Sequence, residues 1–222
     1  MGSITRGLSN NITTGGVILP AGITNSSVSA VTSFANATAA ATLVLLSTQT
    51  ASSSANISFT TGLNSTYDEY IFKFINIHPA TNSAHFSFNG STDSGSNYNV
   101  TKTTTNFRAY HPEDDSTTSL AYEGTFDLAQ STAFQELAYN AGNNNDDNTT
   151  GSLTLFNPSS TTYVKHFIAR LGYSHTTATP AEIDAFTAGY FNTTSAINAI
   201  QFKFNTGNID DGIIKMYGVK KS

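Results

Sequence analysis

The stretch EYIFKFINI, residues 69–77, decides the fold class because its large apolar side chains recur at every second position. Tyr70, Phe72 and Phe74 point to one side of an extended chain, whereas Lys73 points to the other side, since successive side chains of a strand alternate between two faces. A strand with one apolar face needs a second layer to cover that face. The stretch therefore predicts one strand of a two-sheet β-sandwich.

Short segments of the same kind follow one another from about Thr42 to the end of the chain. Asn, Gly, Ser and Asp cluster between the segments, and these residues favour turns. Short strands separated by turns are typical of a sandwich or a barrel and not of alternating strands and helices. The predicted strands are residues 42–47, 56–60, 69–77, 84–89, 97–103, 151–157, 162–170, 199–205 and 212–219.

One segment interrupts this pattern. FDLAQSTAFQELAYNAG, residues 126–142, places Leu128, Phe134 and Leu137 at mixed spacing, with Ala, Gln and Glu between them. A short surface helix over one end of the sandwich and a pair of strands fit this spacing equally well. The predicted fold is thus all-β: an antiparallel, jelly-roll-like β-sandwich over residues 42–222, preceded by an extended N-terminal arm, with one short helix as the open alternative.

Residues 1–41 differ in composition from the rest of the chain and are expected to form the N-terminal arm. Isolated aliphatic side chains stand among small and polar residues there, and glycine and proline breaks disfavour a long helix. Such side chains cannot form a core of their own, so they wrap on the main domain, contact a partner, or belong to a mobile tail. Contact with a partner is the favoured interpretation. The candidate anchoring residues are Ile12, Val17, Ile18, Leu19 and Ile23.

The composition argues against several classes of function. Only 11% of the 222 residues are charged, the formal net charge is −5, and Lys and Arg are spread along the chain, so nucleic-acid binding is not expected. The longest apolar run, residues 39–46, is too short to span a bilayer, so no membrane insertion is expected. Cys is absent, which removes disulfides and thiolate metal sites. No secretory signal pattern is visible at the N-terminus, so an extracellular location would follow from particle assembly or cell lysis.

No motif carries a recognisable catalytic or metal chemistry. The five His residues show no metal-binding spacing, and the adjacent acids at residues 113–115, 146–147 and 210–211 match no calcium loop and are interpreted as solvated turn residues. The nucleophile elbow, the P-loop and the dinucleotide fingerprint are also missing. The two carboxylates of a glycosidase, about 5–10 Å apart, could be found only after folding. We therefore expect no enzyme activity, no cofactor and no metal.

The segment NGSTDSGSN, residues 89–97, joins two predicted strands and is interpreted as an outward hairpin-type loop. Its two Gly residues allow a reversal of the chain, and its Ser, Thr, Asp and Asn side chains can hydrogen-bond the local backbone. Asp93 is its only carboxylate, which is too little charge for a dedicated metal site. If the protein recognises a glycan, Asp93, Asn97 and Tyr98 are the candidate contacts.

Three stretches carry a resemblance to a group of known proteins. SITRGLSNNITTGGVI (3–18), YDEYIFKFINIHPATNSAHFSFNGSTDSGSNYN (67–99) and AIQFKFNTGNIDDGIIKMYGV (199–219) are similar to segments of small virion proteins of tailed bacteriophages, especially marine phages. Residues 105–150 and 171–187 match less distinctly. The resemblance implies a jelly-roll-like β-sandwich on the particle exterior, as a capsid decoration (cement) protein or as part of a tail fibre, and it implies no catalytic residues.

The expected function is accordingly that of a structural virion protein. We expect a homotrimeric capsid decoration protein whose arm docks on the major capsid or tail protein, with host cytoplasm as its location during assembly and the virion exterior as its final location. The alternative is a tail-fibre, receptor-binding protein that recognises a host surface glycan. A glycan-degrading depolymerase is the third hypothesis.

Overall fold

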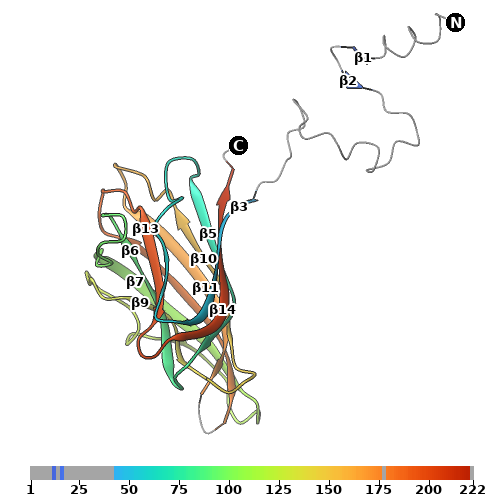
Figure 1. Ribbon diagram of the computed structural model, residues 1–222. Coiled ribbons are helices and arrows are strands. Elements are labelled where there is room, and N and C mark those ends of the chain that lie inside the picture. Colours follow the sequence, from blue (N-terminus) through green and yellow to red (C-terminus); the bar gives the residue numbers. More distant parts are fainter. Residues whose placement is uncertain (1–11, 14–15, 18–42, 177–178, 221–222) are drawn as a thin grey trace, which may run out of the picture. The chain divides into compact units, whose positions relative to one another are not determined.

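The structure is a computed structural model that describes residues 12–13, 16–17, 43–176 and 179–220. Every regular element in these residues is a β-strand, which confirms the predicted all-β class (Figure 1). The chain divides into two units, Met1–Ala40 and Ala41–Ser222. The strands are β1 (Ile12–Thr13), β2 (Gly16–Val17), β3 (Leu43–Ser54), β4 (Ile57–Phe59), β5 (Glu69–Pro79), β6 (Ala84–Ser91), β7 (Lys102–Pro112), β8 (Ser119–Tyr122), β9 (Gln135–Ala141), β10 (Thr149–Phe156), β11 (Lys165–His175), β12 (Ala181–Phe191), β13 (Ala199–Phe204) and β14 (Ile209–Val219).

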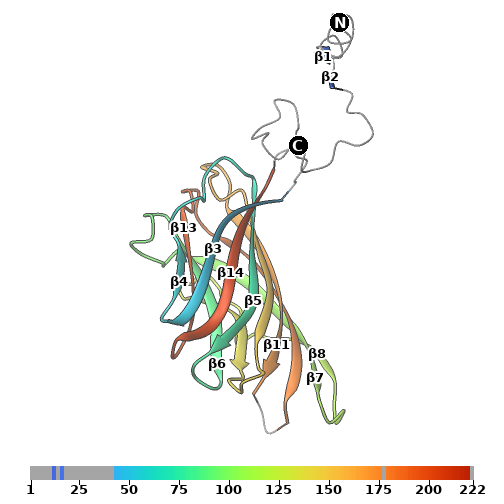
Figure 2. The ribbon, with the colours of Figure 1, turned by 45° about the vertical axis from the view of Figure 1, so that its right-hand side comes forward.

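Strands β3 to β14 form two layers that are antiparallel throughout (Figures 1 and 2). The large sheet has the order β8-β7-β12-β11-β10-β5-β14-β3, and the small sheet has the order β9-β6-β13-β4. The two sheets meet at one residue pair, His175 of β11 with Ala141 of β9. Because twelve strands exceed the eight of a jelly roll, the agreement with the prediction extends to the two-sheet architecture and not to jelly-roll connectivity.

The core between the sheets is aromatic, and Phe202 of β13 lies near its centre. On β5, Tyr70, Phe72 and Phe74 are at most 1% exposed, whereas Lys73 is exposed, which confirms the predicted alternation. The ring centroid of Phe202 lies 5.2–6.3 Å from the centroids of Phe59, Phe72, Phe74, Phe86 and Phe88. Burial of these rings from both sheets is the main stabilising contribution to the sandwich.

The segment 126–142 contains a strand and no helix. β9 pairs with β6 and buries Leu137 and Ala138 against the core. The helix alternative is therefore wrong. Pairing with β6 supplies hydrogen-bond partners for the backbone of β9, so tertiary context overrides the modest helix propensity of its Ala, Gln and Glu residues.

Two strands of the large sheet were not predicted, β8 and β12. β12 pairs along its full length with β11 and with β7. Its buried positions include Ala181, Ala185 and Thr187, and these small side chains give a weak hydrophobic pattern. A strand in the interior of a sheet can carry small residues because its neighbours supply most of the packing.

The connection after β6 is not the predicted hairpin. β6 pairs with β9 and β13 in the small sheet, whereas β7 pairs with β12 and β8 in the large sheet. Residues 92–101 therefore cross between the sheets, and the strand predicted at 97–103 begins only at Lys102. The prediction is wrong because turn residues between two apolar segments show where the chain bends and not which strands pair.

The register fixes which loops share an end of the sandwich. Leu43 at the start of β3 pairs with Val219 near the end of the chain, so the N-terminal segment joins the sandwich at the end where β14 finishes. The connection 92–101 lies at this same end, because β6 runs toward it. The loops 113–118 and 142–148 lie at the opposite end (Figure 2). The connections 92–101, 113–118 and 142–148 are thus divided between the two ends.

Candidate functional site

The candidate anchoring residues are only partly described. Ile12 and Val17 are backbone partners in the short ladder of β1 and β2. Ile18, Leu19 and Ile23 lie outside the described residues. The role of all five residues in attachment stays a prediction.

The predicted glycan contacts in the 89–97 segment bond to their own loop. The carboxylate of Asp93 accepts hydrogen bonds from Ser91 Oγ at 2.6 Å and from the backbone N and Nδ2 of Asn97 at 2.9 and 2.7 Å. These bonds, first that of Ser91 and then those of Asn97, lower the pKa of Asp93 to about 2. The hydroxyl of Tyr98 is buried and has no described hydrogen-bond partner. The structure brings Asp93 and Asn97 together but turns the Tyr98 hydroxyl inward.

The acidic turns predicted to be solvated meet at the far end of the sandwich. Asp146, Asp147, Asp210 and Asp211 line one shallow hollow together with His78. The carboxylate of Asp147 accepts from the backbone N and the Nδ2 of Asn144, each at 2.9 Å. In the described part of the chain, no group of three or more His, Cys, Asp or Glu side chains is arranged to hold a metal ion.

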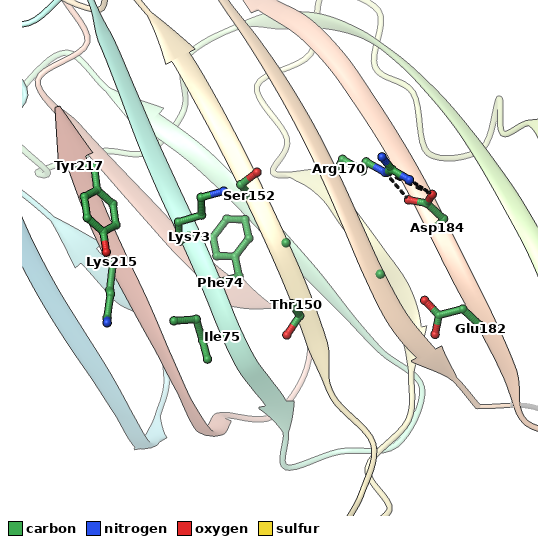
Figure 3. A pocket seen from close by; sticks show the side chains of 12 residues that line it. Lys73, Phe74, Ile75, Thr150, Ser152, Arg170, Glu182, Asp184, Lys215 and Tyr217 are labelled. Atoms are coloured by element: carbon green, nitrogen blue, oxygen red, sulfur yellow. Dashed lines mark hydrogen bonds and ion pairs between the residues drawn. The ribbon is translucent and has the colours of Figure 1, made fainter. Parts of the chain in front are cut away.

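A groove lies on the outer face of the large sheet, with a volume of about 800 Å³ (Figure 3). A single transverse row of side chains crosses this groove, because residues opposite each other in a ladder share a face. The pairs run from Lys215 to Lys73, to Ser152, to Arg170 and to Phe186. We call these five residues, on β14, β5, β10, β11 and β12, the basic row.

Arg170 is the cation of the basic row with an acidic and an aromatic partner. Its Nε lies 3.0 and 3.2 Å from the two carboxylate oxygens of Asp184, and its Nη2 lies 2.7 Å from Oδ2. Its Cζ lies 4.8 Å from the ring centroid of Phe186. The fork to Asp184 raises the pKa of Arg170. The two contacts together fix a planar guanidinium on the sheet surface.

Lys73 and Lys215 stand directly opposite each other on adjacent strands. Neither lysine has an acidic partner within ion-pair distance among the residues that the structure describes. Like charges in this position repel each other and destabilise a sheet. Figure 3 shows both ammonium groups at the groove, with Ser152 beside Lys73 on the next strand.

Aromatic side chains continue the basic row toward the sheet edge. Phe107 of β7 pairs with Phe186, and Tyr122 of β8 pairs with Phe107. The rings of Phe107 and Phe186 stack with centroids 4.7 Å apart and planes at 4°. Phe107 is 42% exposed and Tyr122 is 59% exposed. An apolar platform therefore borders the cations on one side.

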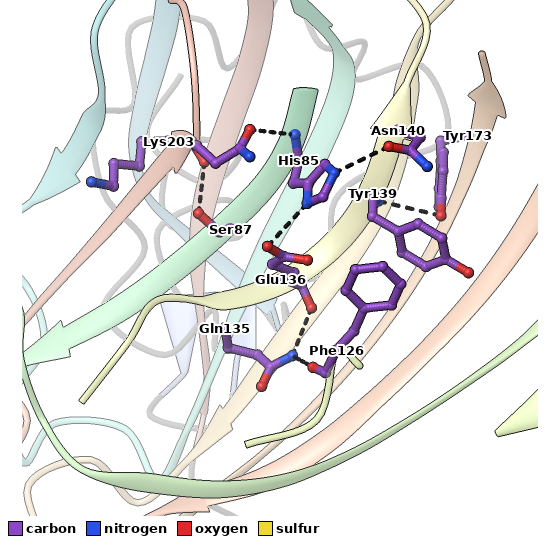
Figure 4. Close-up of polar contacts among 10 residues, drawn as sticks. His85, Ser87, Phe126, Gln135, Glu136, Tyr139, Asn140, Tyr173 and Lys203 are labelled. Atoms are coloured by element: carbon purple, nitrogen blue, oxygen red, sulfur yellow. Dashed lines mark hydrogen bonds and ion pairs between the residues drawn. The ribbon is translucent and has the colours of Figure 1, made fainter. Parts of the chain in front are cut away.

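A second polar cluster lies around β6 and β9, where His85 precedes the core-facing Phe86 (Figure 4). His85 Nδ1 lies 3.0 Å from Glu136 Oε1, and His85 Nε2 lies 3.1 Å from Asn140 Oδ1. The hydrogen bond with Glu136 raises the pKa of His85, whereas burial lowers the pKa of nearby His175. Phe126 stacks on Tyr139 and covers this cluster with its ring. The side chains of His85 and Glu136 are 21% and 27% exposed, so the cluster is half-buried.

Lys102 is a further polar group of the interior. Its side chain is fully buried, and its Nζ donates to Asn89 Oδ1, Val100 O and Ala133 O at 2.9, 3.1 and 2.5 Å. Burial lowers its pKa to about 7. Three acceptors and no carboxylate surround the amine, so it holds the 92–101 connection and the segment before β9 together.

No sequence pattern indicated the basic row as a site. The alternation on β5 does place Lys73 on the face opposite the core. Arg170 and Lys215, however, are distant in sequence, and only the ladder register aligns them with Lys73. Phe186 belongs to β12, which was not predicted as a strand.

No helix in the described residues has the length and apolar character required to cross a membrane. No family model, no curated protein and no solved structure matches this chain.

Proposed function

We propose that the chain is a structural protein of a virion exterior, in which the N-terminal segment attaches to the particle and the sandwich is displayed. This division of roles is supported by the place where the chain enters the sandwich. The chain joins the sandwich at Leu43, on the edge strand β3, and the loops 113–118 and 142–148 lie at the other end. Attachment through residues 1–41 would leave that other end free. Capsid decoration is the role that we propose first, and the resemblance of the sequence to phage virion proteins is compatible with both decoration and a tail fibre.

Self-association into a homotrimer is part of this proposal. A second transverse row on the outer face, adjacent to the basic row, is largely apolar. It follows the pairs Leu45–Tyr217–Ile71–Thr154–Ile168. Leu45 is 52% exposed and Ile168 is 55% exposed. We call these five residues the apolar row; exposed apolar side chains of this kind mark contact surfaces.

Particle assembly tests the attachment step. Particles assembled with the full chain and particles assembled with a chain lacking residues 1–41 are purified, and the copies of this protein per particle are counted by quantitative mass spectrometry. We expect the truncated chain to fold, as judged by its circular dichroism, and to be missing from the particles. Normal incorporation of the truncated chain would show that the arm is not the anchor.

The receptor-binding alternative has one specific observation in its favour, the basic row with its aromatic border. A decoration protein requires no groove with unpaired cations on its outer face. Copy number separates the two roles, because a decoration protein covers the capsid in many copies and a fibre protein is present in few. Binding of the full chain to host cells, measured by co-sedimentation, would support the receptor role.

A further inference from the structure

The geometry points to an acidic glycan as the ligand of the basic row, laid across the strands of the large sheet. This inference deepens the receptor-binding alternative and rests on it. It places the contact on the outer face of the large sheet and not in the 89–97 segment, where Asp93 and Asn97 already satisfy each other. Charge, shape and the surrounding side chains each bear on the class of ligand.

The basic row carries two adjacent positive charges, those of Lys73 and Lys215. Lys73 and Lys215 repel each other across two adjacent strands, and no described carboxylate lies within ion-pair distance of either lysine. The carboxylates that line the groove, Glu182 and Asp184, lie on β12, three strands from β5. This pair of like charges does not stabilise the folded state. A ligand that brings carboxylate or sulfate groups between the two ammonium groups would remove the repulsion and form charge-assisted hydrogen bonds. The lysine side of the groove is therefore complementary to an anion, whereas Glu182 and Asp184 line the β12 side.

Four other basic residues of the described chain, unlike Lys73 and Lys215, are buried or contact an acidic or aromatic side chain. Lys102 and Lys165 are fully buried, and Arg108 is paired with Glu123 at 2.7 Å. Lys203 lies over the ring of Phe134, on the other sheet. The basic row thus concentrates positive charge on one outer face of a chain whose formal net charge is −5.

Arg170 provides a second, separate anion contact. Asp184 occupies its Nε and Nη2, and Nη1 has no hydrogen-bond partner among the described residues. The guanidinium is already held by Asp184 and by the ring of Phe186. Binding there requires little further ordering of the side chain, which reduces the entropic cost.

The shape of the groove suits an extended ligand. From Lys215 on β14 to Asp184 on β12 the groove crosses four strand spacings, or about 19 Å. The volume of about 800 Å³ falls within the range of ligand sites. Gly172 contributes no side chain to its floor, where an added Cβ would lie 2.9 Å from Glu182 Oε1. The stacked rings of Phe107 and Phe186 continue this surface and offer apolar contact to the ring faces of sugars.

A glycan fits these observations better than a nucleic acid does. The basic row holds three cations: Lys215 and Lys73 are directly opposite on adjacent strands, and Arg170 lies beyond Ser152 on β11. A nucleic acid carries a charge at every nucleotide, and its binding draws on many Lys and Arg contacts. Three cations supply few phosphate contacts, whereas a glycan also gains apolar contact from the rings of Phe107 and Phe186.

Binding of polysaccharides to the full chain tests the inference. Isothermal titration is carried out with alginate oligomers, which carry carboxylates, with heparin oligomers, which also carry sulfates, and with neutral dextran of matched length. We expect binding to one or both acidic probes, weakening at least tenfold from low to high salt, and no binding to dextran. Equal binding to dextran, or binding to none of the three, would overturn the inference.

Paired variants locate the contact. Lys73→Gln combined with Lys215→Gln should weaken binding of the acidic probe at least tenfold, whereas Lys203→Gln on the other sheet should change it less than twofold. The thermal midpoint of the double variant should equal or exceed that of the wild type, because a repulsion is removed. An unchanged affinity in the double variant, or an equal loss in Lys203→Gln, would contradict the assignment.

Two rival occupants give distinct results. Tighter binding of a single-stranded oligonucleotide than of either acidic glycan would assign the row to nucleic acid and overturn the inference. Self-association that disappears in the double variant, without any glycan binding, would assign the row to a second copy of the chain and also overturn it. Neither result depends on particle incorporation, so a failure here is distinguishable from a failure of the proposed attachment role.

Discussion

At the scale of single residues, Phe202 carries a large share of the packing between the sheets. Its side chain is fully buried and contacts rings from β4, β5 and β6. Phe202→Ala should lower the free energy of unfolding by about 3–5 kcal/mol, because it leaves a cavity that rings from both sheets cannot fill. Denaturant unfolding measures this loss.

Phe107→Ala is the matched control for that measurement. Phe107 is 42% exposed and stacks only on the outer face. Its loss should cost about 1 kcal/mol, the contribution of one exposed aromatic pair. Equal losses for the two variants would contradict the central position of Phe202 in the core.

Lys102 makes the stability of the sandwich depend on pH. Its pKa is about 7 in the folded state and ordinarily 10.5, so between these values the unfolded state binds more protons. The free energy of unfolding contributed by this group therefore rises as the pH rises from 7 toward 10.5. Lys102→Met should be about 2 kcal/mol less stable at pH 7, because Val100 O and Ala133 O lose their donor.

Unfolding measured at several pH values separates the titration of the Lys102 amine from the loss of its hydrogen bonds. The difference in unfolding free energy between the wild type and Lys102→Met should grow from pH 7 to pH 9, since only the wild type loses a buried charge over that range. Both proteins are unfolded with urea at each pH. A difference that stays constant with pH would mean that the amine does not titrate near 7.

At the scale of elements, the sequence predicted best where large side chains alternate. β5 and β13 bury Phe72, Phe74 and Phe202 in strict alternation, and both strands were predicted within two residues of their ends. β12 was missed because its buried positions include Ala181 and Ala185, which give little contrast with the exposed positions. Strand pairing was not predictable from either pattern, since pairing depends on long-range contacts.

The connection from β6 to β7 shows what local sequence does determine. The prediction that its polar side chains form local hydrogen bonds is confirmed, because Asp93 accepts hydrogen bonds from Ser91 and Asn97. The hairpin was wrong because nothing in those residues states that the chain changes sheets. The hydrogen bonds within the connection therefore define its local shape independently of the strands that it joins.

The pKa of Asp93 tests that local shape. Carboxyl chemical shifts should titrate with a midpoint near 2, below the ordinary value of 3.8. Because the folded-state pKa is lowered, the contribution of this carboxylate to stability is present above pH 3.8 and is lost as the pH falls through 2. Ser91→Ala removes the largest cause and should raise the midpoint toward 3.8, whereas Ser96→Ala, which bonds only a backbone oxygen, should not. A midpoint near 3.8 in the wild type would contradict these hydrogen bonds.

At the scale of the whole molecule, the candidate site is a product of register. Lys73, Arg170 and Lys215 lie far apart in the sequence and become neighbours only because β14, β5, β10 and β11 pair without a shift at these positions. A slip of one residue in any of these ladders would turn the side chain to the core. The sequence could therefore place Lys73 on an outer face but could not assemble the basic row.

The apolar row leads to a prediction about the assembled state. A monomer would expose Leu45, Ile71 and Ile168 to water side by side on the outer face, whereas a homotrimer that uses this surface would bury them. Ile168→Asp places a charge in the middle of the apolar row and should convert a trimer to a monomer, as measured by light scattering after gel filtration. Leu120→Asp, on the edge strand β8 at a side chain that is 75% exposed, is the matched control and should leave the mass unchanged. A monomeric wild type would refute the homotrimer, and a trimer that persists in Ile168→Asp would place the subunit contact on another surface, because a buried unpaired carboxylate costs several kcal/mol in an apolar contact.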